Sequence, residues 1–238
     1  MGRGFLRALL AALVLAAMSG GGWWLYHAPA LSIRDVEVGG ANALSDEVVR
    51  SVADLGRQSV LRPDFGGARQ RLLALPLVKE ARISRAWPTN ARITIVERTP
   101  AALWQVGDRR YVIDDDGVVL DQPPPEGAPL IVQMDTAPSL APGDRVDAGA
   151  VAVAERLTLT AQQTLARSVA ALQFSQASGL TAVLSGRTSD EYLWVTFGDA
   201  QGYEFKLAAL YAVLRRAEEE GRTLRRVDLR FGDRVAVQ

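Results

Sequence analysis

The chain has 238 residues, of which 48% are apolar and 23% charged, enough for one or two packed cores; two small domains are the better fit. Its 27 basic and 27 acidic residues balance, which excludes the overall positive field expected of a nucleic-acid-binding protein. The lack of cysteine excludes disulfides, zinc-thiolate sites and thiol nucleophiles. The only histidine, His27, precedes the domains, so histidine-dependent triads and metal sites within them are excluded as well.

The N-terminal region predicts a membrane anchor. Residues 8–26 carry no charge, and a helix needs roughly 20 such residues to cross a bilayer. Arg3 and Arg7 precede the stretch, and Trp23, Trp24 and Tyr26 lie at its other end. This arrangement favours a cytoplasmic N-terminus. We therefore expect a cytoplasmic tail at residues 1–7, a transmembrane helix at 8–26, and the rest of the chain outside the cytoplasm. A cleaved signal peptide is the alternative, since residues 28–30 are small.

The next segment predicts a small α+β domain over residues 31–99. A strand is expected at 33–38, and Ser45 begins a helix because it is a good N-cap followed by two acidic residues. A second helix over 65–75 ends before Pro76. Apolar and polar residues then alternate on both sides of a turn at residues 87–90, which indicates a hairpin.

A second, β-rich domain is expected at residues 100–238. Short strands separated by turn residues are predicted at residues 101–106, 111–113, 117–120, 130–133, 169–174, 180–184 and 192–197. One helix is expected over 148–166 and another from Tyr203 to Gly221. The second helix is predicted to bury one face, made of Leu207, Leu210, Tyr211 and Leu214. The fold class is therefore α+β, with two helices in the larger domain.

A hairpin is predicted at the C-terminal part of the sequence. Val227, Leu229 and Phe231 share one side of a strand, and Asp228 and Arg230 share the other. Gly232 and Asp233 form a two-residue turn into the last strand, which is expected to be an edge of the sheet. The alternation favours Phe231 as a core residue.

Several short motifs occur in the order found in one protein family. They are Val36-Glu37-Val38-Gly39-Gly40, Leu75-Pro76-Leu77-Val78, Arg85-Ala86-Trp87-Pro88, Glu97-Arg98-Thr99-Pro100-Ala101, Val112-Ile113-Asp114 and Val227-Asp228-Leu229-Arg230-Phe231. With these motifs in this order, the chain resembles the FtsQ/DivIB cell-division proteins. The resemblance implies a short cytoplasmic tail, one membrane span, a POTRA domain and a β domain.

The resemblance also implies a function without catalysis or cofactors. Proteins of this family bind the membrane coiled-coil proteins FtsB and FtsL (DivIC in some lineages) and help to recruit and regulate septal peptidoglycan synthesis. A partner strand and helix dock near the end of the β domain, which here corresponds to Asp228, Leu229, Arg230, Phe231 and Gly232. The implied location is the inner membrane at the septum, with the domains in the periplasm. Arg230 is expected to pair with a partner carboxylate, although a surface arginine beside Asp228 is the alternative.

Other functions remain open from the sequence. POTRA domains also serve in secretion and outer-membrane assembly, and an anchored envelope hydrolase is formally possible, although no carboxylate pair is marked by its spacing. The acidic run that begins at Asp114 predicts a β-turn because its spacing does not fit a calcium loop. Trp87 and Trp104 are expected to pack at domain ends, with a docking surface as the alternative for Trp87.

Overall fold

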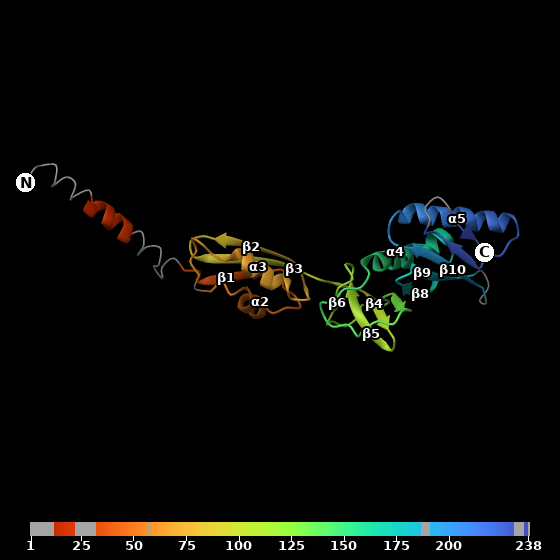
Figure 1. Ribbon diagram of the computed structural model, residues 1–238, viewed down its shortest axis with the longest axis horizontal. Helices are drawn as coiled ribbons and strands as arrows, with labels where there is room; N and C mark the ends of the chain where they lie inside the picture. The colour runs from red at the N-terminus through yellow and green to blue at the C-terminus, as the bar shows by residue number, and fades with distance from the viewer. Residues whose placement is uncertain (1–11, 22–31, 57, 187–190, 231–235, 238) are drawn as a thin grey trace, which may run out of the picture. The chain divides into compact units, whose positions relative to one another are not determined.

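The computed structural model describes residues 12–21, 32–56, 58–186, 191–230 and 236–237. The chain divides into two compact units, Met1–Arg98 and Thr99–Gln238, coloured red to yellow and yellow-green to blue in Figure 1. Each unit has its own core of buried apolar residues, and the two cores share no residue. The fold is therefore two separately packed α+β units.

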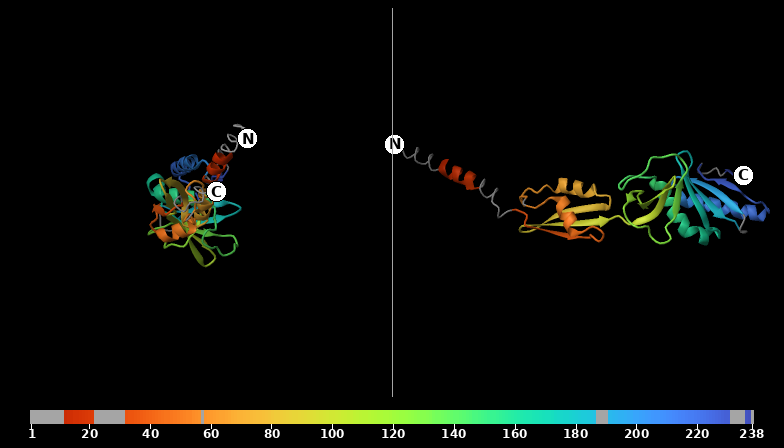
Figure 2. Two further views of the ribbon diagram at one scale, coloured as in Figure 1. Left: turned by 90° about the vertical axis from the view of Figure 1, so that its left-hand side faces the viewer. Right: turned by 90° about the horizontal axis from the view of Figure 1, so that it is seen from below.

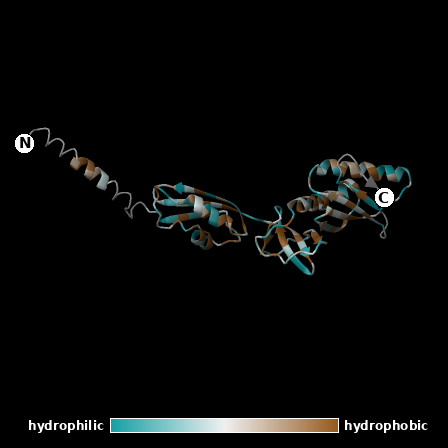
Figure 3. Cartoon of the chain, viewed as in Figure 1, coloured by the Kyte–Doolittle hydropathy of each residue, from teal (hydrophilic) through white to brown (hydrophobic). Residues whose placement is uncertain are grey.

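Residues 12–21 form a helix whose side chains are all exposed. Figure 3 shows apolar residues over most of its length and neutral colour near residues 19–21. In the described part of the chain, no helix combines the length and the hydropathy needed to span a membrane. The described helix covers only part of the predicted span at 8–26, so that span stays a prediction.

The first unit has the element order predicted from the sequence. It contains β1 (Asp35–Gly39), α2 (Asp46–Ala53), α3 (Phe65–Leu73), β2 (Val78–Ala86) and β3 (Asn90–Glu97). The sheet order is β1-β3-β2, with β1 parallel and β2 antiparallel to the central β3. Both helices lie on one side of the sheet (Figure 2), and their buried residues join those of the strands in one core. Ser45 caps α2 as expected, accepting a hydrogen bond from the Val48 N–H.

Both edge strands of this sheet are fastened by arginines from the helices. Arg50 of α2 donates a hydrogen bond from Nε to the Val36 carbonyl at 2.8 Å. Arg69 of α3 donates from Nε to the Ala81 carbonyl at 3.0 Å. An exposed edge strand normally offers its carbonyls to another chain, so these contacts reduce the capacity of β1 and β2 to add a strand.

Glu97 closes the loop between β1 and α2. Its carboxylate accepts hydrogen bonds from the backbone N–H groups of Asn42, Ala43 and Leu44 at 2.8–3.1 Å. Partial burial opposes ionisation, but the N–H donors outweigh it and lower the pKa of Glu97. The ionised carboxylate is therefore the form that the folded loop favours.

Replacing Glu97 with glutamine is expected to destabilise the first unit by about 1 kcal/mol, because charge-assisted hydrogen bonds become neutral ones. Since the folded-state pKa is lowered, the contribution is complete above the unfolded pKa and disappears as pH falls through the folded pKa. Thermal unfolding of wild type and variant at pH 7 and at pH 3 measures this. Equal differences in stability at both pH values would contradict the account.

The second unit is built on a mixed nine-stranded sheet. Its elements are β4 (Pro100–Val106), β5 (Arg109–Asp114), β6 (Val119–Leu120), β7 (Leu130–Gln133), α4 (Ala148–Leu165), β8 (Val169–Ser175), β9 (Gly179–Ser185), β10 (Tyr192–Gly198), α5 (Tyr203–Glu219), β11 (Arg226–Asp228) and β12 (Ala236–Val237). The strand order is β12-β11-β10-β9-β8-β7-β4-β5-β6. Neighbouring strands are antiparallel except at β4–β7, β7–β8 and β10–β11. The predicted β-rich domain with two helices is confirmed.

Helix α5 buries a different stripe from the one predicted. Leu207, Leu210 and Leu214 are buried as expected, but Tyr211 is 46% exposed. Lys206 is buried instead, at 6% exposure, because the stripe that faces the strands follows positions 203, 206, 207, 210, 214 and 217. The prediction for Tyr211 was wrong because it lies beside this stripe rather than on it.

The two tryptophans predicted at domain ends differ in burial. Trp104 is buried, donates a hydrogen bond to the Gln133 side chain at 2.9 Å, and lies with its ring centroid 5.1 Å from that of Phe174. Trp87, in the turn between β2 and β3, is 68% exposed, so its predicted packing role was wrong. The alternative, a docking surface, stays open for Trp87.

The acidic run forms the predicted turn. The Asp114 backbone N–H bonds to the Val118 carbonyl at 3.0 Å, and the Asp114 carboxylate accepts the Val118 N–H at 2.6 Å. Gly117 adopts φ of +75°, which a residue without Cβ tolerates. Asp114, Asp115 and Asp116 come close enough to hold an ion. Their arrangement is that of an acidic turn, and acidic side chains in such turns are common without metal.

Candidate functional site

Strands β8 to β11 present a groove on the side of the sheet that carries polar and aromatic side chains. The groove has a volume of about 520 Å³, and its lining includes Met134, Gln173, Thr181, Trp194, Thr196, Asp228 and Arg230. On β10 and β11, the residues that alternate with Trp194, Thr196 and Asp228 point to the opposite side of the sheet. Val195 and Val227 are examples, and both are buried. The groove therefore combines an exposed aromatic ring, hydroxyl groups and an ion pair.

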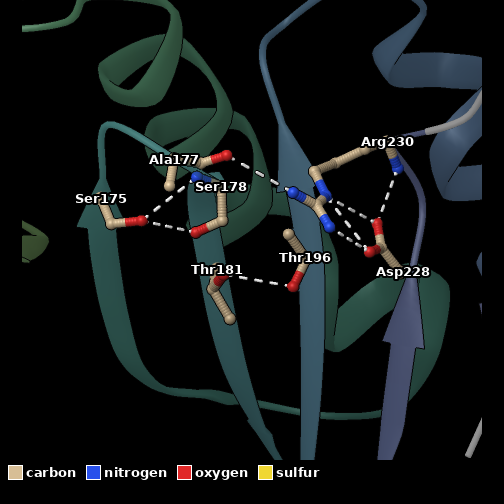
Figure 4. A network of polar contacts seen from close by, with 7 residues as sticks. All are labelled: Ser175, Ala177, Ser178, Thr181, Thr196, Asp228 and Arg230. Carbon is tan, nitrogen blue, oxygen red and sulfur yellow. Dashed lines mark hydrogen bonds and ion pairs between the residues drawn. The ribbon is translucent and has the colours of Figure 1, made fainter.

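Asp228 and Arg230 form the ion pair at one end of this groove (Figure 4). Arg230 donates from Nε to both carboxylate oxygens at 3.0 and 3.1 Å and from Nη2 to Oδ2 at 2.7 Å. The Arg230 backbone N–H adds a further bond to Oδ1 at 3.0 Å. These contacts, the Arg230 guanidinium first, lower the pKa of Asp228 despite its partial burial. The pair fixes the guanidinium of a side chain that is still about one-third exposed.

Two glycines make room for the stem of Arg230. Gly198, with φ of +73°, has the Arg230 Cγ only 2.9 Å from where a Cβ would lie. A Cβ on Gly179, with φ of +68°, would lie 2.5 Å from the Gly198 carbonyl oxygen. Side chains at either position would clash and would also strain the backbone. The close approach of β9 and β10 thus holds Arg230 over the sheet, where Nη1 also reaches the Ala177 carbonyl at 3.5 Å.

The predicted site residues are placed in part by the structure. Val227 and Leu229 are buried while Asp228 and Arg230 lie on the other side, which confirms the predicted alternation. Phe231 and Gly232 lie outside the described residues. Strand β12 pairs with β11, with Val237 opposite Val227, and is the end of the sheet, so the predicted edge strand is confirmed.

A second groove, which the sequence reasoning missed, adjoins the first. It has a volume of about 980 Å³ and shares Trp194 and Arg226 with the first groove. Its lining is rich in arginine and aromatic side chains: Arg167, Tyr192, Trp194, Arg222, Arg225 and Arg226. Among the described residues, the side chains of Arg225 and Arg226 have no hydrogen-bond or ion-pair partner. The adjacent Arg225-Arg226 pair, at the start of β11, was the sequence signal that could have indicated this surface.

Comparison with known proteins assigns both units. Residues 31–98 match the family model for the POTRA domain, FtsQ-type, and residues 102–230 match the model for the cell division protein FtsQ/DivIB C-terminal domain. Together the two matches cover most of both units and end before β12. The chain belongs to the FtsQ/DivIB family.

Relatives with the name "Cell division protein FtsQ" agree with the family assignment. The one from Mycobacteroides abscessus is 32% identical over 209 residues, 86% of this chain and 64% of the relative. The one from Chloroflexus aurantiacus is 31% identical over 185 residues, 76% of this chain and 66% of the relative. That of Mycobacterium tuberculosis is 38% identical over 124 residues, half of this chain and 40% of the relative. The chain thus spans less than two thirds of each of these FtsQ proteins.

Proposed function

We propose that the chain is a non-enzymatic scaffold of the cell-division machinery, anchored in the inner membrane by residues 8–26, with both folded units in the periplasm. Its partners would be membrane coiled-coil proteins of the FtsB and FtsL type, through which it recruits and regulates septal peptidoglycan synthesis. The observation that carries the proposal is the open edge of β12 next to an arginine held in place by Asp228. The FtsQ-type match of the POTRA domain favours this role over secretion or outer-membrane assembly.

The edge and the grooves suggest how a partner is recognised. A partner strand can pair with β12 through main-chain hydrogen bonds, while a neighbouring segment of the same partner lies in the grooves. The arginines at positions 222, 225, 226 and 230 favour a partner segment that carries carboxylates. Phe231 and Gly232, together with Asp228, Leu229 and Arg230, belong to this proposed partner-binding site.

Anchoring both partners in one membrane strengthens a modest interface. Two proteins confined to the same bilayer meet at a high effective concentration, so the edge and the arginines need not supply high affinity alone. This agrees with the polar and charged residues that line the grooves, among them Thr181, Arg226 and Asp228.

The test uses the full chain purified from detergent-solubilised membranes, with co-purifying proteins identified by mass spectrometry. We expect coiled-coil division proteins with the wild type and about 10-fold less of them with Arg230→Glu, since the new carboxylate repels an acidic partner and Asp228 loses its cation. Arg215→Glu, a charge reversal on the exposed side of α5, is the matched control and should bind as wild type does.

The results test the role of Arg230 in binding separately from the assignment to cell division. Equal recovery with wild type and Arg230→Glu, both folded by circular dichroism, would remove Arg230 from the site. Recovery of secretion components in place of coiled-coil proteins would overturn the division assignment.

A further inference from the structure

One end of the POTRA sheet gathers the start of the domain and an exposed tryptophan. Asp35 at the start of β1 and Ala86 at the end of β2 both lie opposite Asn90 of β3, and the Arg34 N–H bonds to the Thr89 carbonyl at 2.8 Å. The turn that holds the exposed Trp87 connects β2 and β3 at this end. The chain therefore enters the domain beside Trp87, and it leaves the domain after Glu97, at the opposite end of the sheet.

Exposed basic side chains occur at the same end. Arg34 lies next to Thr89, and Arg85, two residues before Trp87, donates a hydrogen bond to the carbonyl of the exposed Leu61 at 3.0 Å. Arg62 follows Leu61. In the part of the chain that the structure describes, the side chains of Arg34 and Arg62 form no hydrogen bond or ion pair.

The nearby acidic groups are already engaged. The Asp35 carboxylate accepts the Val36 N–H at 2.8 Å, and Asp64 caps α3 and lies 3.6 Å from Arg71. Neither of them is paired with Arg34, Arg62 or Arg85. Within the described residues, this end of the domain therefore presents a tryptophan and a leucine among three arginines that form no ion pair.

We propose that this end of the POTRA domain contacts the membrane surface, with Trp87 among the phospholipid headgroups and Arg34, Arg62 and Arg85 against anionic phosphates. The inference rests on the proposed membrane anchor. Five residues lie between Tyr26, the end of the predicted span, and Ser32, and the six Cα–Cα steps reach about 20 Å at most, so the domain entry lies within about 20 Å of the bilayer surface. Tryptophan favours the headgroup region, and guanidinium groups bind phosphate oxygens. Such contacts would limit the orientations of the POTRA domain relative to the membrane.

The lack of cysteine allows a direct measurement with the full chain. Single-cysteine variants Leu15→Cys, Val48→Cys and Ser84→Cys, each carrying a fluorophore, are reconstituted in nanodiscs that contain anionic phospholipid and lipid-borne nitroxide quenchers. Ser84 is exposed and lies three residues before Trp87, whereas Val48 is exposed in the first turn of α2, which follows the loop held by Glu97 at the other end. We expect several-fold stronger quenching at Ser84 than at Val48, and strong quenching at Leu15.

The three labels separate the two proposals. Equal quenching at Ser84 and Val48, with Leu15 quenched, would overturn the headgroup contact and leave the anchor intact. An unquenched Leu15 label would overturn the anchor and the contact that rests on it.

A second set of variants tests the residues named in the proposal. In the Ser84→Cys background, Trp87→Ser should lower the quenching in every nanodisc, while Arg34→Gln with Arg62→Gln should lower it only when anionic lipid is present and salt is low. Unchanged quenching with Trp87→Ser would mean that another feature holds the domain at the surface. If this end of the domain binds a protein partner instead of lipid, the Ser84 label would stay unquenched in nanodiscs that hold this chain alone.

Discussion

Replacing Lys206 with methionine is expected to destabilise the second unit by about 3 kcal/mol, because the buried Phe197 carbonyl and the partly buried Asp199 carbonyl lose their donor. The Lys206 ammonium donates to the Phe197 carbonyl at 2.8 Å, to the Asp199 carbonyl at 2.9 Å and to the Asp199 carboxylate at 2.9 Å. Methionine conserves most of the volume of the aliphatic stem, so the loss reports on these hydrogen bonds rather than on a cavity. Chemical denaturation followed by far-UV circular dichroism measures the difference.

The control is another cation on the same helix. Arg215 forms an exposed pair with Glu219 at 3.2 Å, and Arg215→Met should change stability by less than about 1 kcal/mol. The Lys206 hydrogen bond is also the main reason that the pKa of Asp199 is lowered, so its pKa should rise in the methionine variant. Similar unfolding midpoints for both methionine variants would show that the contacts of Lys206 contribute little.

Proline at the edge strand is expected to abolish partner binding, a drop of about 100-fold in affinity, because proline has no N–H and its ring prevents the approach of a strand. Successive residues of a strand direct their N–H groups to opposite sides, so one of Ala236→Pro and Val237→Pro removes a donor facing β11 and the other removes a donor facing the free edge. The binding of a purified FtsB-type partner and the thermal unfolding temperature are measured for each variant. Together they show which variant lost the donor facing β11 and which lost the donor at the free edge.

The free-edge variant should lose binding with a wild-type unfolding temperature, whereas the inward variant should lose both. Ala236→Ser and Val237→Thr retain the N–H groups and serve as matched controls. Full binding by both proline variants would rule out strand addition at β12 and leave side-chain contacts in the grooves as the recognition mode.

Local patterns predicted most of the fold correctly. The cap Ser45, and the alternation of Val227 and Leu229 with Asp228, depend on neighbours in the sequence, so periodicity and cap chemistry were sufficient. Strand order depends on distant pairings. Nothing in the sequence reasoning indicated that β7 inserts between β4 and β8, parallel to both.

The errors and omissions share a physical origin. The burial of Lys206 was missed because lysine is rarely buried. Its hydrogen-bond acceptors come from the end of β10 and the following loop, which only the folded chain brings close to Lys206. Trp87 was expected to pack at a domain end, but it lies in the turn between β2 and β3, where few neighbours can cover its ring, and it is exposed. For the site, Asp228 and Arg230 were found by a motif, but the second groove joins Arg167, which precedes β8, with residues from β10, from the end of α5 and from the segment that leads into β11.

The position of β11 and β12 in chain order has a consequence for biogenesis. Both strands follow every other strand of the sheet in the sequence, and β11 completes its pairing with β10 only after α5 has been made. When the folded units are translocated in the order of their synthesis, the edge proposed for partner recruitment is therefore the last part of the sheet to assemble. A chain cut short before β11 would fold its POTRA unit yet lack the docking edge, so recruitment would depend on completion of this sheet.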